Sequence, residues 1–228
     1  MGFFKKLFEK KQETAMMDRQ KVDEADELDP LYQAKKEAME SILGEMYGLV
    51  GHAIIPFQVG GAVDMYYFPN AREGTAFATM ELIESENKGP IPNRNGMYEL
   101  VAFTRHKVDK QVGAMTGAKG DPFDTIERRI CGIFTMMGHY SYTAKLEPGE
   151  TCEIPNDKGD NTCLVFDEYA VDGQEILIAG KKFGLLVCIE VFRSEMEYAM
   201  EYGSAELFKK LKEAGCYPYS DLDRDPVV

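Results

Sequence analysis

The sequence predicts a single α+β domain in which helices flank a mixed, mostly antiparallel sheet. Segments rich in aromatic and β-branched residues, bounded by turn residues, are typical of strands. Other segments repeat apolar residues at helical spacing, and two of them begin with Asp-Pro. The two kinds of segment do not alternate regularly, which argues against a parallel, doubly wound sheet.

The first helix is expected to begin at Pro30 and to run to about Gly48. Asp29 can cap it, and proline is favoured in the first helical turn. Its apolar positions recur at helical spacing: Leu31, Ala34, Ala38, Ile42 and Met46. We therefore expect the folded domain to span residues 30–228.

Residues 1–29 are expected to form an amphipathic arm (Met1–Lys11) and a charged linker (Gln12–Asp29). In a helix, the apolar side chains of the arm would share one face with lysines around it: Phe3, Phe4, Leu7 and Phe8. Such a helix can lie in a membrane interface, so a peripheral membrane adaptor is one alternative function. A terminal helix that docks on the core, or frays, is the plainer alternative.

The expected strands share an apolar, aromatic or β-branched composition. They are Ala62–Phe68, Thr75–Ile83, Met97–Thr104, Ser141–Leu146, Cys163–Val171, Gln174–Ile178 and Phe183–Phe192. The last is nearly unbroken apolar, which suits a central strand covered on both faces.

Further helices are expected after Asp121-Pro122 and after Ser194. The first should end at Gly138, a natural helix stop. The second should carry a capping box, in which Ser194 bonds a first-turn amide and Glu197 reaches back to the Ser194 amide.

Composition narrows the classes of function. The net charge of −13 argues against a nucleic-acid partner and is compatible with a basic protein partner. The five cysteines form no C-x-x-C pair, and the three histidines lack ligand spacing, so we expect no metal, cofactor or disulfide framework. We find no secretory signal and no apolar run of the roughly 20 residues that span a bilayer, so we expect a cytoplasmic protein.

No catalytic motif is evident. The glycine-rich segment 113–120 fails the spacing of a phosphate-binding loop, and no G-x-S-x-G elbow occurs. We therefore expect no catalytic residue. The alternative is an unrecognised hydrolase that uses strand carboxylates with His106 or His139.

Three acidic residues interrupt otherwise apolar strands: Asp64, Glu81 and Glu99. Period-two alternation places Glu99 on the face opposite Tyr98. If adjacent strands align, the three form an acidic row with Tyr66 nearby. We expect this row, together with Tyr66 and Tyr98, to contact a basic peptide or protein. Solvated outward positions without a function are the alternative.

The C-terminal tail carries Asp221, Asp223 and Arg224. An arginine near carboxylates commonly docks a tail, so we expect a structural ion-pair cluster here and no metal site.

Several segments also carry a family likeness. They are Val63–Tyr66, Gly96–Val101, Gly184–Leu186, Ser194–Ala199, Gly203-Ser204 with Leu207 and Leu211, Tyr217-Pro218, and Asp221–Arg224 with Val227-Val228. Through them, roughly from Asp29 to Val228, the chain resembles the bacterial branch of the Suppressor of fused family. Asp225-Pro226 departs from the serine-containing ending of that pattern.

The resemblance implies a non-enzymatic α+β protein-binding domain. Animal members hold zinc-finger transcription factors by clamping a peptide as an added strand. The resemblance covers only the N-terminal domain of those proteins, so we do not expect transcription-factor binding. Bacterial relatives are commonly assigned as immunity proteins. We therefore expect an immunity protein that neutralises a toxin by occlusion or by strand addition at a sheet edge.

Overall fold

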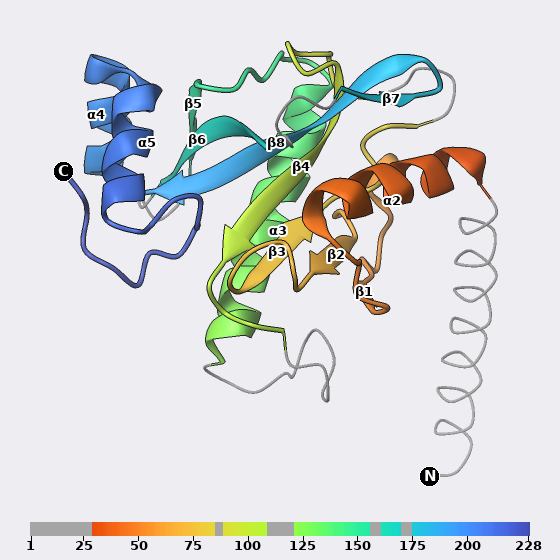
Figure 1. Cartoon of the computed structure of the whole chain (residues 1–228), viewed down its shortest axis with the longest axis horizontal. Helices are drawn as coiled ribbons and strands as arrows, with labels where there is room; N and C mark the ends of the chain where they lie inside the picture. The colour runs from red at the N-terminus through yellow and green to blue at the C-terminus, as the bar shows by residue number, and fades with distance from the viewer. Residues whose placement is uncertain (1–28, 85–88, 109–120, 156–160, 170–174) are drawn as a thin grey trace, which may run out of the picture.

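The computed structural model describes residues 29–84, 89–108, 121–155, 161–169 and 175–228. The strands of these parts form an open eight-stranded sheet in the order β1-β2-β3-β4-β8-β6-β5, and β7 pairs with β8 (Figure 1). The pairing of β4 with β8 is parallel, and the other strand pairings described are antiparallel. The expected α+β fold with a mixed, mostly antiparallel sheet is confirmed.

The strands are β1 (Val50–Gly51), β2 (Met65–Phe68), β3 (Thr75–Ala78), β4 (Met97–Thr104), β5 (Thr151–Ile154), β6 (Thr162–Tyr169), β7 (Ile176–Ile178) and β8 (Lys181–Val191). The helices are α2 (Pro30–Leu43), the short 3₁₀ helix η1 (Phe57–Val59), α3 (Pro122–Ser141), α4 (Arg193–Tyr202) and α5 (Ser204–Glu213).

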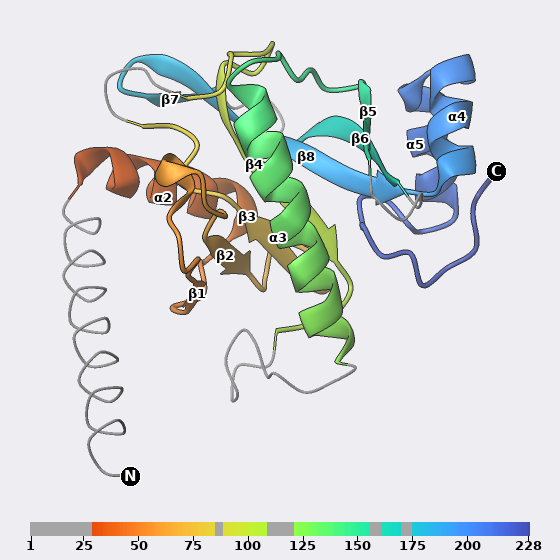
Figure 2. The ribbon, with the colours of Figure 1, turned by 180° about the vertical axis from the view of Figure 1, so that it is seen from behind.

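Helices cover both faces of the sheet. α3 packs on one face, and α2 with the α4–α5 pair packs on the other (Figures 1 and 2). Because side chains alternate along a strand, β8 places Leu185 and Val187 in one core and Leu186 and Cys188 in the other. The expectation of a central strand covered on both faces is confirmed.

The two Asp-Pro signals begin helices as expected. The Asp29 carboxylate accepts a hydrogen bond from the Leu31 amide at 2.9 Å, and Asp121 accepts one from the Phe123 amide at 2.9 Å. Each carboxylate therefore satisfies a backbone donor that the first turn leaves without a helical partner. α2 ends at Leu43, earlier than expected, because Gly44 adopts a positive φ of 85°.

The strand expected at Ser141–Leu146 is wrong, because α3 continues past Gly138 to Ser141 and residues 142–146 form a turn and irregular structure. Gly138 is a packing position rather than a helix stop. A Cβ added there would lie 3.0 Å from side-chain atoms of Leu82 and Phe57, so glycine permits close contact between α3 and the segments beneath it.

The capping box expected from Ser194 and Glu197 is also wrong. α4 begins at Arg193, and the Glu195 carboxylate accepts from the Phe192 amide at 3.0 Å. Ser194 lies inside the helix, where its hydroxyl donates to the Val228 carbonyl. The helix cap lies two residues earlier and is only half of a box: the buried Glu195 supplies the returning carboxylate, whereas Phe192 has no side-chain acceptor for the second bond.

The expected amphipathic arm, all of the linker except Asp29, and the glycine-rich segment 113–120 lie outside the described residues. Within the described ranges, no helix has the length and apolar character that crossing a membrane requires.

Candidate functional site

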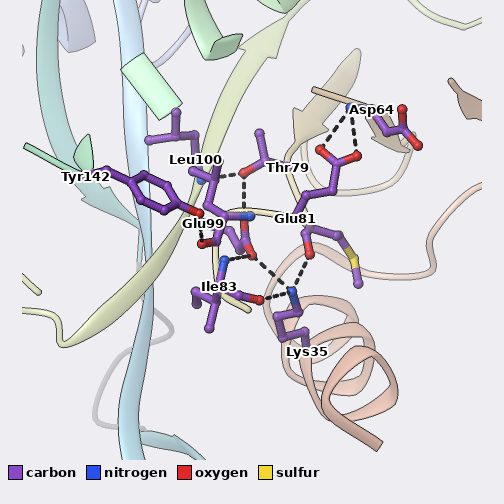
Figure 3. A network of polar contacts seen from close by, with 10 residues as sticks. Lys35, Asp64, Thr79, Glu81, Ile83, Glu99, Leu100 and Tyr142 are labelled. Carbon is purple, nitrogen blue, oxygen red and sulfur yellow. Dashed lines mark hydrogen bonds and ion pairs between the residues drawn. The ribbon is translucent and has the colours of Figure 1, made fainter. Parts of the chain in front are cut away.

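The candidate site is organised from within by Glu99, which β4 places beneath α2 and which is 0% exposed. Its carboxylate accepts from the Thr79 hydroxyl at 2.7 Å, the Leu82 amide at 3.2 Å and the Ile83 amide at 3.1 Å (Figure 3). Three donors therefore hold residues 79–83 against the start of β4. These bonds replace the strand pairing expected there, and β3 accordingly ends at Ala78.

Lys35 of α2 supplies the positive charge opposite Glu99. Its Nζ lies 3.3 Å from the Glu99 carboxylate and donates to the carbonyls of Ile83, at 2.8 Å, and Met80. A buried carboxylate and a buried ammonium are tolerated because each is charge-paired and hydrogen-bonded. The contacts of Lys35 also fasten α2 to the 80–83 segment.

The expected surface exposure of Tyr98 and Glu99 is therefore wrong. Alternation does place them on opposite faces, but α3 covers the face of Tyr98 and α2 covers the face of Glu99. Both side chains are fully buried and can influence a partner only from inside the fold.

The segment fastened by Glu99 presents Glu81 toward Asp64 (Figure 3). The Asp64 amide donates to the two Glu81 oxygens, at 3.0 and 2.9 Å. The Asp64 carboxylate accepts from the Ala53 amide at 2.7 Å and lies 2.7 Å from Nδ1 of His52. Desolvation by burial, together with the Asp64 charge, raises the pKa of Glu81 to about 8.

A cavity of about 230 Å³ opens between α2 and residues 80–84. Its walls combine acidic, aromatic and apolar side chains: Asp29, Leu31, Tyr32, Lys35, Gln58, Tyr66, Met80, Glu81, Ile83 and Glu84. Of the acidic residues expected to form a row, Glu81 lines this acidic cavity, Asp64 borders Glu81, and Glu99 lies behind the wall. Tyr66 of β2 lines it as well, with its ring centroid 6.5 Å from that of Tyr32.

The cavity can hold a cation chemically. Among the described residues that line it, the cationic side chain is Lys35, whose Nζ is already bound by Glu99 and two carbonyls. Carboxylates and tyrosine rings together favour a lysine or arginine head group through ionic and cation–π attraction. Asp29 and Glu84 were not expected from the sequence, because nothing in the chain order shows that residues 29 and 84 meet.

The two histidines proposed for a hydrolase lie elsewhere. His139 stacks on Phe57 and approaches the Gly61 carbonyl at 3.2 Å. His106 lines a second cavity, of about 270 Å³, with Arg129, Asp221 and Asp223. Neither is among the residues that line the acidic cavity, whereas His52, which sequence reasoning missed, lies beside Asp64, just before β2. In the described part of the chain, no three His, Cys, Asp or Glu side chains are grouped to hold a metal ion.

The C-terminal tail is anchored at two points. Asp221 accepts from the Thr104 hydroxyl at 2.5 Å and from the Arg105 amide at 2.8 Å. Arg224 forms a bidentate pair with Glu195, at 2.6 and 2.8 Å. Its carboxylate partner is therefore on α4 and not within the tail, as the sequence had suggested. Asp223 instead lies 3.6 Å from His106.

Comparison with known proteins supports the fold. No protein-family model and no curated protein match the sequence. Among solved structures, a chain of the Sufu–Fu complex matches with a TM-score of 0.55 and 13% identity, covering 86% of this chain and 91% of that one. A SUFU (suppressor of fused protein) homologue from Neisseria gonorrhoeae FA 1090 matches with a TM-score of 0.52 and 12% identity, covering 86% and 96%. The expected likeness is confirmed for the fold: the chain has a Suppressor-of-fused-like fold.

Proposed function

We propose that this chain is a non-enzymatic protein-binding module whose acidic cavity receives a basic side chain of its partner. The observation that carries the proposal is the cavity wall itself. It presents the carboxylates of Asp29 and Glu84 beside Glu81, which holds a proton near pH 7 because its pKa is raised to about 8, while Lys35 is already engaged by Glu99. A lysine or arginine from a partner would supply the missing positive charge and pack its stem against Tyr32 and Tyr66.

The comparisons and the charge favour the same class of function. A neighbour of the same fold was crystallised as the Sufu–Fu complex, which is a protein–protein assembly. The net charge of −13 would steer a basic partner toward this chain and repel an acidic one. The proposed contact set keeps Asp64, Tyr66 and Glu81 from the sequence prediction and adds Asp29 and Glu84.

Occlusion of the partner's surface is favoured over strand addition beside β2. β1 already pairs Val50 with Tyr66 and Gly51 with Met65, and the Tyr47 amide donates to the Tyr67 carbonyl at 2.8 Å. The outer edge of β2 is thus largely occupied, which leaves few backbone groups for an incoming strand. Side-chain contacts at the cavity would carry the binding.

The biological role we propose is that of an immunity protein for a basic toxin domain in the cytoplasm. The family resemblance and the acidic charge support this role. Cells that express a candidate toxin should stop growing, and co-expression of this chain should restore their growth. The variant Glu84→Lys should not restore it. Full protection by Glu84→Lys would contradict the role of the cavity.

Affinity capture from the source cells tests the binding proposal. The wild type, Glu84→Lys and Glu213→Lys would be used as baits and the captured proteins quantified by mass spectrometry. Glu213 is exposed at the end of α5, so its reversal is a matched change of charge away from the cavity. We expect a basic protein on the wild type and on Glu213→Lys that is lost on Glu84→Lys. Identical profiles for all three baits would overturn the proposal.

A further inference from the structure

Large apolar side chains are exposed beside the acidic cavity. Ile54 is 90% exposed, Ile55 58% and Val59 73%. Single exposed apolar residues are common, but three within one short loop form a surface that gains free energy when it is covered. We call these three residues the apolar lip.

The lip is held in a fixed position next to the cavity. Gln58, which adjoins Val59 in η1, lines the cavity. The Ala53 amide, next to Ile54, is bound by Asp64, whose own amide holds Glu81. The loop also folds tightly on itself, since a Cβ added at Gly61 would lie 1.8 Å from the Ile55 carbonyl oxygen. The lip and the cavity are therefore parts of one surface, apolar on one side and acidic on the other.

We propose that the N-terminal arm of this same chain, Met1–Lys11, occupies this surface. The arm is the complement of the surface in composition: it carries Phe3, Phe4, Leu7 and Phe8 for the lip, and Lys5, Lys6, Lys10 and Lys11 against a single glutamate for the cavity. Burial of the phenylalanines against the lip and pairing of lysines with Asp29 and Glu84 would act together.

The connection between the arm and the surface permits this contact. The described structure begins at Asp29, which itself lines the cavity, so the preceding chain starts from the cavity rim. Residues 12–28 connect the arm to this point. At about 3.3 Å per extended residue they reach on the order of 50 Å, well beyond the neighbouring lip. A tethered segment also acts at a high effective concentration, so a weak contact suffices.

The arm is then a resident competitor for the site. A partner would have to displace the arm. The apparent dissociation constant of the partner would then be its intrinsic value divided by the fraction of chains in which the arm is undocked. The inference rests on the proposed binding site but not on the identity of the partner, and it can be tested without one.

Photo-cross-linking of the full chain tests the inference directly. The photoreactive residue p-benzoylphenylalanine would replace Val59 in one variant and, as a matched control, Tyr202 in another. Tyr202 is 56% exposed on α4. A third variant would carry the group at Ile54, so that a folding defect at one position leaves a second probe. Cross-linked peptides would be identified by mass spectrometry from a mixture of isotopically light and heavy chains.

We expect cross-links from positions 59 and 54 to residues 1–11 of the same chain, and none from position 202. They should be lost when Lys5, Lys6, Lys10 and Lys11 are all changed to Glu. Three results would overturn the inference: no cross-link to the arm from either lip position, equal yield from position 202, or cross-links only between light and heavy chains, which would show a second copy on the lip. Flotation with phosphatidylcholine–phosphatidylserine vesicles that requires Phe3 and Phe4, without any intramolecular cross-link, would assign the arm to a membrane instead.

A failure of the arm contact can be told apart from a failure of the proposed partner site. Cross-links to the arm together with unchanged capture by Glu84→Lys would keep the arm contact and remove the partner site. Loss of capture by Glu84→Lys without cross-links would do the reverse.

Discussion

Glu99 shows how one buried side chain shapes the surface above it. It is 0% exposed, yet its three hydrogen-bond donors and Lys35 fix the course of residues 79–83. That course decides where Glu81 points. The residue therefore acts on the cavity without being part of its wall.

Glu99→Ala should destabilise the fold by about 3–5 kcal/mol, because it leaves the Lys35 ammonium and two amides buried without their acceptor. Urea unfolding followed by circular dichroism measures this change. The double variant Lys35→Met with Glu99→Ala should lose less than the sum of the single changes, since the uncompensated charge is gone. Strict additivity would contradict the proposed coupling.

Glu81 gives the stability a pH dependence. Its pKa is raised from an ordinary value of 4.5 to about 8 in the folded chain, chiefly by burial. Between these values the folded state binds a proton that the unfolded state has released, so stability should fall as pH rises from about 5 to 8. Below pH 4.5 this contribution is fully present.

The free energy of unfolding of the wild type and of Glu81→Gln, measured with urea at several pH values, tests this pH dependence. Burial also raises the pKa of Glu127, to about 7, so both proteins should lose stability up to that pH. The wild type alone should continue to lose stability up to about pH 8. Parallel curves across pH 7–8 would show that Glu81 is not perturbed in this way.

At the scale of helices and strands, the start of α4 is anchored by a different glutamate from the one that the sequence pattern favoured. The side chain of Glu195 is 0% exposed and that of Arg224 is 9% exposed, and the pair joins the start of α4 to the tail. Glu195 also accepts from the Phe192 and Val227 amides. Glu197, which the pattern favoured as the capping residue, is mostly exposed and lies 4.0 Å from Arg193.

Glu195→Ala should therefore cost about 3–5 kcal/mol, since it leaves Arg224 unpaired and removes a helix cap. Glu197→Ala is the matched control and should stay within about 0.5 kcal/mol of the wild type. Thermal or urea unfolding compares them. The reverse order of effects would restore the capping box expected from the sequence.

The elements that the sequence predicts well are those with local signals. The two Asp-Pro caps begin α2 and α3, and β4 has the expected bounds of Met97–Thr104. The missed features depend on distant partners. Gly138 lies inside α3, where Leu82 and Phe57 pack closely against it. Strand alternation alone does not tell which face of β4 is covered by α2.

At the scale of the whole molecule, the site joins segments that are remote in the chain. The cavity wall comes from α2, β2, η1 and residues 80–84, and the apolar lip comes from the loop around η1. No local sequence pattern predicts that these segments come together. The sequence did indicate Asp64, Tyr66 and Glu81 as contact residues, which stays a prediction, whereas Asp29, His52 and Glu84 required the structure.

Binding that is guided by charge makes the association rate depend on salt concentration. With a net charge of −13 and an acidic cavity, association with a basic partner should slow steeply as salt rises, while dissociation changes less. Stopped-flow measurements with the captured partner at two ionic strengths would show it. An association rate that does not respond to salt would mean that charge does not guide the encounter.

The proposed binding site is tested most directly by dissociation constants. The captured partner would be purified, and its dissociation constant measured for the wild type, Glu84→Lys and Glu213→Lys in the same buffer. We expect Glu84→Lys to weaken binding at least tenfold, or by about 1.4 kcal/mol, and Glu213→Lys to leave it within about twofold. Equal affinities for the wild type and Glu84→Lys, or equal losses in both variants, would contradict the claim that the cavity between α2 and residues 80–84 is where this chain holds its partner.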